Sequence, residues 1–372
     1  MKRLATFAAA LALAASPVSA QQDLLEACAP SQLTIVANPS VPGGVPTEIQ
    51  NQFSYLCGQV VNALSNVQPT VGIAFSGGAH TLGTASTIGR RLGFMPRISV
   101  TARANAAFVS VPDAFGGFSA TVTDGGTVES MPTSGLPLAA LQGDVVIGVF
   151  NGFSLGPAAG GLGAVDLLGS VSFIPAIQKV EDVTGLREDI VNIGIGARVG
   201  ILQQGLVMPG ISVSAMYRTM GEVAFGDLDN PAPAAFASDL SVLSLRAGVS
   251  KGILTFDFAA GAGYDIYTSD AQLNWNLTYE CPATTCGTAT TVDLQPDQPV
   301  AGELRTAAWN VYGNVGISLL LLNIVGEVGY QKATDVLDAA AFQEAGLPAQ
   351  DPTTDALGGG RFFASLGARL TF

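Results

Sequence analysis

The sequence predicts an all-β protein: a closed antiparallel transmembrane β-barrel of about ten strands, at most about fourteen, with an N-terminal helical plug or cap segment. Three observations lead to this prediction. Apolar and polar residues alternate in many segments after residue 94, which is typical of strands with one apolar face. Only 12% of the residues are charged, whereas a soluble domain usually has about 25%. The joins between these segments are alternately short and mostly long, as in membrane barrels.

The last strand of the chain carries the most specific pattern. From Phe362 to Phe372 every second residue is apolar, and the residues between them are mostly small or polar. This pattern resembles the closing strand of Gram-negative outer-membrane β-barrels, which ends in Phe and is read by the barrel-assembly machinery. The resemblance implies that Phe372 is an assembly signal and that the protein lies in the cell outer membrane.

The amino terminus is typical of an export signal. Lys2 and Arg3 precede the apolar residues 4–15, and residues 18–20 form a small-residue cleavage site. We therefore expect residues 1–20 to be a cleaved signal peptide. The apolar run is shorter than the roughly 20 residues that a transmembrane helix needs. The chain has 29 acidic against 16 basic residues, and this balance argues against nucleic acid as a partner.

The four cysteines form two pairs that are close in sequence. An exported chain reaches an oxidising compartment, where disulfides are stable. We expect one disulfide between Cys28 and Cys57 and a second between Cys281 and Cys286. No metal site and no cofactor are expected, because the spacings match no zinc pattern and the only histidine, His80, is far from both pairs in sequence.

Residues 21–94 differ from the chain that follows. Apolar residues at helical spacing predict one amphipathic helix over about residues 47–66, ending before Pro69. Cys57 lies on this helix, so a bond to Cys28 would attach the leading segment to it. The segment is interpreted as a plug inside the barrel, and a cap on the periplasmic side is an equally weighted alternative.

Residues 95–372 are predicted to form the outer-membrane β-barrel. Strands are expected near residues 95–109, 143–154, 163–175, 189–201, 209–223, 239–250, 253–268, 304–319, 322–332 and 360–372. Outer-membrane barrels have short periplasmic turns and long extracellular loops, so the long joins, which are rich in Asp and Glu, would form the outer surface. One of them is predicted to contain a hairpin that the bond between Cys281 and Cys286 closes at its tip.

Strand parity assigns most charged strand residues to the lumen, because they share a face with small and polar residues. The predicted lumen-lining charges are Arg97, Arg103, Asp166, Arg198, Arg218, Arg246, Asp257, Asp265, Glu327 and Arg369. A turn at residues 251–252 would place Arg246 opposite Asp257. Most of these charges are expected to form a ring near the periplasmic strand ends. They would either pair and fill a narrow lumen or line a constriction that selects solutes.

No catalytic residue is predicted, and the protein is not expected to be an enzyme. The outer-membrane phospholipase and omptin-protease families need a histidine beside a serine or an acid, and nothing in the sequence positions such a group near His80. His80 is interpreted as a residue that caps or contacts the plug. The acidic stretch 227–230 lacks the spacing of a calcium-binding loop and is interpreted as solvated surface.

The helix before the strands and the long loops resemble the architecture of FadL-type hydrophobic-substrate channels, although residues 38–40 match the Asn-Pro-Ala pattern of their hatch only in part. The resemblance implies passive transport of a small solute, including an apolar one. The alternative is a non-conducting surface barrel whose acidic loops contact ions, lipopolysaccharide or a partner, and a barrel-embedded hydrolase comes third. Other expected partners are outer-membrane lipids, the barrel-assembly machinery and periplasmic chaperones.

Overall fold

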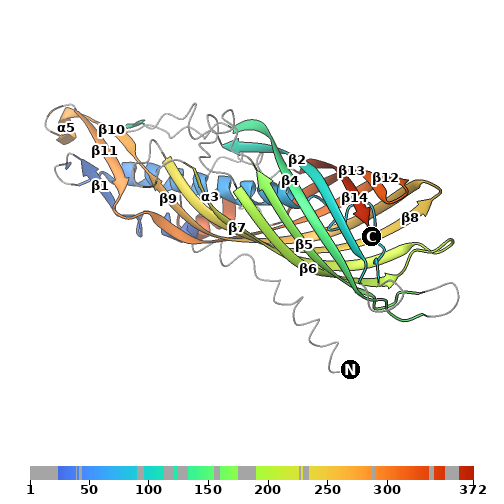
Figure 1. Ribbon diagram of the computed structural model, residues 1–372. Coiled ribbons are helices and arrows are strands. Elements are labelled where there is room, and N and C mark those ends of the chain that lie inside the picture. Colours follow the sequence, from blue (N-terminus) through green and yellow to red (C-terminus); the bar gives the residue numbers. More distant parts are fainter. Residues whose placement is uncertain are drawn as a thin grey trace, which may run out of the picture.

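The computed structural model of the protein contains a closed barrel of antiparallel strands (Figure 1). It describes residues 24–38, 40–41, 44–89, 96–112, 121–123, 133–154, 160–174, 190–225, 228, 234–286, 288, 290–334, 339–347 and 360–372. The barrel strands are β2 (Ile98–Pro112), β4 (Thr133–Phe150), β5 (Val165–Ile174), β6 (Ile190–Leu202), β7 (Gly210–Phe225), β8 (Ala234–Ile253), β9 (Phe256–Trp275), β12 (Val300–Leu319), β13 (Leu322–Ala333) and β14 (Arg361–Thr371). β14 pairs with β2 and closes the cylinder, which confirms the predicted fold class and strand number.

The two openings of the barrel differ in their connections. At one opening, the turn end, residues 254–255 join β8 to β9 and residues 320–321 join β12 to β13. The carboxy-terminal strand also ends there, where the backbone N of Thr371 donates to the carbonyl of Leu321 (3.4 Å). The opposite opening, the loop end, holds the longer connections, such as residues 276–299. Most joins follow the predicted alternation of short and long, but residues 151–164 at the turn end form a longer join than residues 226–233 at the loop end.

The turn between β8 and β9 lies later in the chain than the sequence predicted, so Arg246 is not opposite Asp257. Lys251 belongs to the strand, and its Nζ donates hydrogen bonds to three backbone carbonyls of residues 205–208 in the neighbouring turn (2.7–3.3 Å). The true turn was not evident because Leu254 occupies a left-handed conformation (φ 56°) for which Asn or Gly is usual.

The outer wall of the barrel is apolar, with many exposed Val, Ile, Leu and Phe side chains. Aromatic side chains gather toward both ends. Tyr330 packs against Trp309 and Phe362 toward the loop end, and Phe256 packs against Phe258 toward the turn end. A strand that rises about 3.3 Å per residue and tilts by about 40° gains about 25 Å in ten residues. This is the height of the apolar band of a membrane barrel, and Trp309 stands that far from the end of β12.

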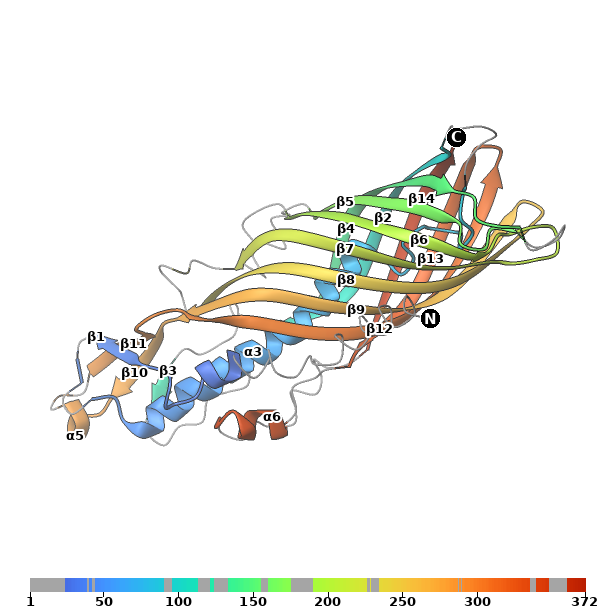
Figure 2. The ribbon, with the colours of Figure 1, turned by 90° about the horizontal axis from the view of Figure 1, so that it is seen from below.

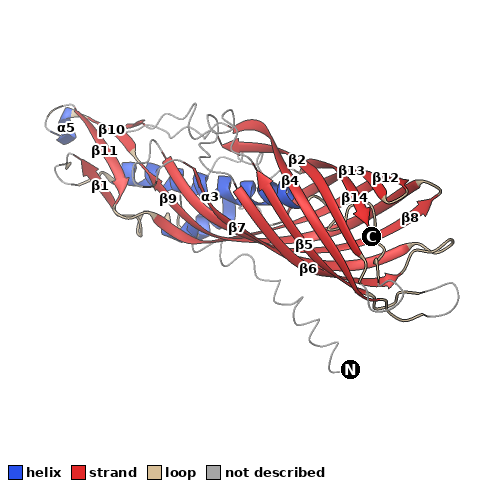
Figure 3. Ribbon diagram, viewed as in Figure 1, coloured by secondary structure: helices blue, strands red, loops and turns tan. Residues whose placement is uncertain are grey.

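A single long helix, α3 (Thr47–Ser76), enters the barrel through the loop end (Figures 2 and 3). The predicted end of this helix, near residue 66, is wrong, since the helix continues through Pro69. A proline inside a helix removes one backbone hydrogen bond. Here the barrel wall binds the same turn of the helix: the carbonyl of Asn66 accepts a hydrogen bond from Arg361 Nη1 of β14 (3.0 Å), besides one from Thr70 Oγ1 within the helix (3.1 Å). Tertiary contacts therefore maintain the helix where local preference would end it. No helix of the described part of the chain is long and apolar enough to cross a membrane.

Beyond the loop end, the first half of α3 carries a small folded unit, here called the cap. Its sheet has the order β1 (Ile35–Asn38), β11 (Thr290–Pro296), β10 (Leu277–Cys281) and β3 (Thr121–Thr123). Two short helices, α5 (Ala283–Cys286) and α6 (Ala339–Glu344), lie near this sheet and α3 (Figure 2). One apolar cluster joins α3 to the sheet and to the extended ends of β9 and β12. Within it the rings of Phe53 and Trp275 pack 5.4 Å apart.

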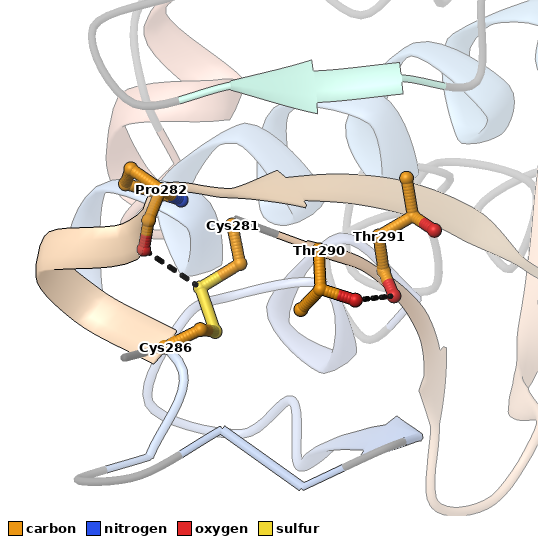
Figure 4. Close-up of a disulfide and its surroundings, with 5 residues drawn as sticks. All are labelled: Cys281, Pro282, Cys286, Thr290 and Thr291. Atoms are coloured by element: carbon orange, nitrogen blue, oxygen red, sulfur yellow. Dashed lines mark hydrogen bonds between the residues drawn. A yellow bond between two sulfur atoms is a disulfide. The ribbon is translucent and has the colours of Figure 1, made fainter. Parts of the chain in front are cut away.

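Both expected disulfides are present in the cap. Cys28–Cys57 attaches the leading residues to α3, and Cys281–Cys286 closes the predicted hairpin, which β10 and β11 form. Figure 4 shows the second bond, with α5 forming the tip of the hairpin. The signal peptide expected at residues 1–20 lies outside the described residues, as do residues 227, 229 and 230 of the acidic stretch.

Candidate functional site

The lumen of the barrel is occupied by the chain that follows α3. The helix ends at Gly77, whose positive φ (59°) reverses the backbone and whose N–H donates to the carbonyl of Ile73 (2.8 Å). Residues 77–89, here called the plug segment, continue toward the turn end and are mostly buried. A Cβ at position 78 would lie 2.6 Å from the Cβ of Tyr312, so the close approach to the wall requires glycine there.

Glu327 of β13 binds the start of the plug segment. Its carboxylate is 2% exposed and accepts hydrogen bonds from the backbone N–H groups of Gly78 (2.8 Å) and Ala79 (2.9 Å). Ser365 Oγ donates a third hydrogen bond to it (3.2 Å). A carboxylate that accepts backbone N–H groups makes charge-assisted hydrogen bonds, which are stronger than neutral ones. Glu327 thus fixes the backbone where the helix becomes the plug segment.

Two arginines bind the carbonyls of the same stretch. Arg103 donates to the carbonyls of Ser76 (2.8 Å) and Ala79 (2.9 Å), and its Nε lies 3.1 Å from Asp144. Arg246 donates to the carbonyl of Gly78 through Nε (2.5 Å). Its two Nη atoms form a bidentate ion pair with the carboxylate of Asp265, at 2.7 and 3.1 Å.

The end of the plug segment is bound in the same way. Asp166 accepts the backbone N–H groups of Ile88 (3.1 Å) and Gly89 (3.4 Å), and it pairs with Arg198 at 2.7 Å. Arg198 also donates to the carbonyl of Thr84 (3.2 Å). The remaining contacts of this kind are Arg369 with the carbonyl of Leu82 (2.6 Å) and Arg97 with the carbonyl of Ile88 (3.3 Å). Charged lumen residues therefore hold the plug segment mainly by its backbone.

Seven of the ten predicted lumen charges contact the plug segment, and three do not. Asp265 acts through its pair with Arg246. Asp257 is half-buried near the turn end and accepts hydrogen bonds from Ser318 and Asn323 (both 2.5 Å). Arg218 is 1% exposed, and it donates to Ser244 (3.3 Å), while its Nε and Nη2 have no hydrogen-bond partner in the described part of the chain.

Sequence reasoning missed Asp144 and Arg361, which also face the lumen. Asp144 pairs with Arg103, and Arg361 binds the backbone of α3 at Asn66. Parity could have found Asp144, because it alternates with the exposed Val145. Parity could have found Arg361 as well, because it shares a strand face with Ser365 and Arg369.

His80 lies at the centre of the lumen. Its Nδ1 is 2.8 Å from Ser214 Oγ, a contact that the sequence did not indicate, and its Nε2 has no partner among the described atoms. A cavity of about 20 Å³ adjoins it, lined also by Arg198, Arg246 and Tyr312. That volume suits about one water molecule. A wider open pocket of about 630 Å³ lies on the cap and includes Glu26 and Asp297.

Comparisons with known proteins find similarity to solved structures of outer-membrane barrels. No family model matches the chain, and no curated protein matches it. The solved structures that resemble it include the outer membrane protease OmpT from Escherichia coli, at 10% identity over 74% of this chain and 96% of that chain (TM-score 0.32). The translocator domain of the autotransporter NalP from Neisseria meningitidis is 8% identical over 85% of this chain and 97% of that chain (TM-score 0.36). A Pseudomonas aeruginosa FadL homologue is 11% identical over 74% of this chain and 90% of that chain (TM-score 0.22).

The protein is a β-barrel of the outer-membrane type. A closed wall with an apolar exterior and a charged interior supports this conclusion without the comparisons. At the identities and scores given above, the comparisons carry no argument about activity.

Proposed function

We propose that this protein is a sealed outer-membrane barrel that displays its own disulfide-linked amino-terminal cap at the cell surface. The observation that carries the proposal is the path of residues 24–89. They begin in the cap beyond the loop end, pass through the lumen as α3, and reach the turn end as the plug segment. In this proposal, residues 77–89 act as the plug that the sequence analysis gave as one alternative, and the cap lies at the opposite end from the periplasmic cap that was the other.

The orientation of the barrel supports surface display. In outer-membrane barrels the short turns face the periplasm and the long loops face outward. The cap lies at the loop end, so it faces the outside of the cell. Both disulfides lie in the cap, and covalent links are valuable in a small unit with a limited apolar core.

The lumen contacts support a sealed barrel. Three buried ion pairs neutralise lumen charges: Arg103–Asp144, Arg198–Asp166 and Arg246–Asp265. The arginine of each pair also binds the backbone of the plug segment, and Asp166 does so as well. The pair of His80 and Ser214 adjoins space for about one water molecule, which is too little for a substrate. We therefore assign this pair to positioning of the plug segment and not to hydrolysis.

An epitope tag tests the display. A tag inserted between Gln22 and Asp23 should bind antibody on intact cells, because Leu24, the next described residue, lies in the cap. A matched tag between Gly205 and Leu206, in the turn between β6 and β7, should bind only after the outer membrane is permeabilised. If the first tag also needs permeabilisation while the second does not, the orientation is reversed and the proposal is wrong.

A second candidate is gated passage of a small solute, our first expectation from the sequence. One observation favours it: the plug segment is held by polar contacts, which water can replace, and not by a sealed apolar core. Its removal would open a lumen lined by charges, suited to a polar solute and not to an apolar one. Planar-bilayer recording separates the candidates. A sealed barrel is silent over hours, whereas a gated one opens repeatedly at moderate voltage.

A further inference from the structure

The turn end carries apolar side chains where a barrel facing water would carry polar ones. Leu206, Leu254 and Leu320 are 101%, 98% and 104% exposed, which makes them the most exposed large apolar residues of the described chain. In the same turns Val207 is 84% exposed and Leu321 is 62% exposed. These five residues, here called the apolar rim, occupy the tips of three turns: β6–β7, β8–β9 and β12–β13.

The residue types at these tips are unusual for the backbone they adopt. Leu254 and Leu320 have φ values of 56° and 57°, a conformation that Asn and Gly enter far more easily than leucine. Each therefore combines an unfavourable backbone with a fully exposed apolar side chain. Neither choice improves the turn itself, so a contact outside the protein has to account for both.

The apolar rim is continuous with the lipid-facing wall. Along β12 the exposed side chains Val315, Ile317 and Leu319 lead without a polar interruption to Leu320. At the next turn, exposed Ile253 leads in the same way to Leu254. Thr255, which follows Leu254, is exposed, whereas Lys251 turns its Nζ back to protein carbonyls in the β6–β7 turn. The rim thus extends the membrane surface and is not a separate patch.

The height of the wall identifies the medium that meets the rim. Trp309 belongs to the aromatic cluster toward the loop end, and Leu320 follows it by eleven residues. At about 3.3 Å per residue and a tilt of about 40°, this separation is about 28 Å along the barrel axis. A bilayer has a hydrocarbon core of about 30 Å. If the aromatic cluster marks one boundary of that core, the rim lies at the other.

We infer that the apolar rim is a lipid-binding surface that inserts into the periplasmic leaflet of the outer membrane, at the level where the acyl chains meet the phospholipid head groups. Its partner is the phospholipid bilayer and not a periplasmic protein. The turns then act as anchors that set the depth of the barrel in the membrane. The lipid contact itself depends only on the membrane-spanning barrel, whereas its assignment to the periplasmic leaflet rests on the orientation given in the proposed function. A reversed orientation would therefore change the leaflet and not the quenching by lipid.

Depth-dependent fluorescence quenching tests the inference. In a Trp309→Phe background, Leu206→Trp and Leu321→Trp each place one indole in the rim, at positions without a left-handed backbone. The other native tryptophan, Trp275, is buried in the cap and gives a constant contribution. Gln298→Trp, at an exposed site of the cap, is the matched control. Each variant is reconstituted in phosphatidylcholine vesicles, either unmodified or brominated on the first third of the acyl chain.

Brominated lipid should lower the fluorescence of the introduced indole by about twofold or more in both rim variants, and it should leave the fluorescence of the control indole unchanged. The emission maximum of the rim indoles should also be blue-shifted. Heat-modifiable migration on a gel establishes that each variant is folded. The inference is overturned if folded rim variants are quenched no more than the control. It is also overturned if the emission of the rim indoles becomes blue-shifted only when a periplasmic extract is added, since that outcome assigns the rim to a protein partner.

Discussion

The cap and the plug segment belong to one continuous stretch of chain, yet different forces hold them. In the cap, the side chains of Phe53, Leu56 and Trp275 are at most 1% exposed and pack into one apolar cluster beside a disulfide. In the plug segment, lumen arginines and carboxylates bind backbone N–H and carbonyl groups. The cap is thus specified by its own side chains, whereas the plug segment is specified largely by the side chains of the barrel.

This difference decides where substitutions should matter. A substitution inside the cap removes apolar packing, and its effect on stability stays within the cap. A change in a lumen charge also leaves its former partners without compensation in a buried setting, which costs more than the contact itself. The predictions below test this contrast, from the largest expected effect to the smallest.

Asp265→Ala should have the largest effect. It leaves the guanidinium of Arg246, 4% exposed, without its bidentate partner, and breaking a buried pair in this way typically costs about 3–5 kcal/mol. The free energy of unfolding in urea, measured in lipid vesicles, gives the effect. Asp257→Ala is the matched control, since among the described residues that half-buried carboxylate accepts hydrogen bonds from the neutral groups of Ser318 and Asn323. Equal losses in the two variants would contradict the importance of the buried pair.

The two disulfides should differ in the stability that they provide to the cap. Cys28–Cys57 closes a loop of 29 residues, for which the chain-entropy estimate is about 3–4 kcal/mol. Cys281–Cys286 spans only 5 residues, and the same estimate is about 2 kcal/mol. When protease resistance is followed against urea concentration, the cap of the double Cys→Ser variant of Cys28 and Cys57 should therefore unfold at a lower urea concentration than that of the double variant of Cys281 and Cys286.

The conductance of the same variants sharpens the comparison. Loss of either disulfide should leave the barrel silent in a planar bilayer, because the contacts that seal the lumen lie far from the cap. If the double variant of Cys28 and Cys57 opens the barrel, the cap and the plug segment form one cooperative unit, and the contrast between them is wrong.

The sequence predicted the barrel well because its signals are periodic. Alternation over about ten residues fixes which face a side chain occupies, and Arg198 and Arg246 were assigned to the lumen on this basis alone. The hairpin with Cys281 at its tip was predicted for the same reason. β1 and β3 were not predicted, because strands of 4 and 3 residues are too short to show a period.

The sequence could not predict contacts that depend on backbone groups. Every residue has a backbone carbonyl, and every residue except proline has a backbone N–H. Nothing in the residue types therefore marks Gly78 or Ala79 as hydrogen-bond donors to Glu327. Pairing partners also depend on register. Because the turn is at Leu254 and not at Lys251, the partner of Arg246 is Asp265 and not Asp257.

The smallest expected effect tests the backbone contacts one at a time. Arg369 is partly exposed and donates one hydrogen bond, from Nη1 to the carbonyl of Leu82 (2.6 Å). Arg369→Met keeps most of the side-chain volume but removes the donor, so the unfolding free energy should fall by about 1 kcal/mol. Arg369→Lys keeps a donor and should recover part of that loss. If Arg369→Met costs nothing while Leu82→Ala costs several kcal/mol, apolar packing of the plug segment outweighs the charged contacts. The plug segment and the cap would then be held by the same force.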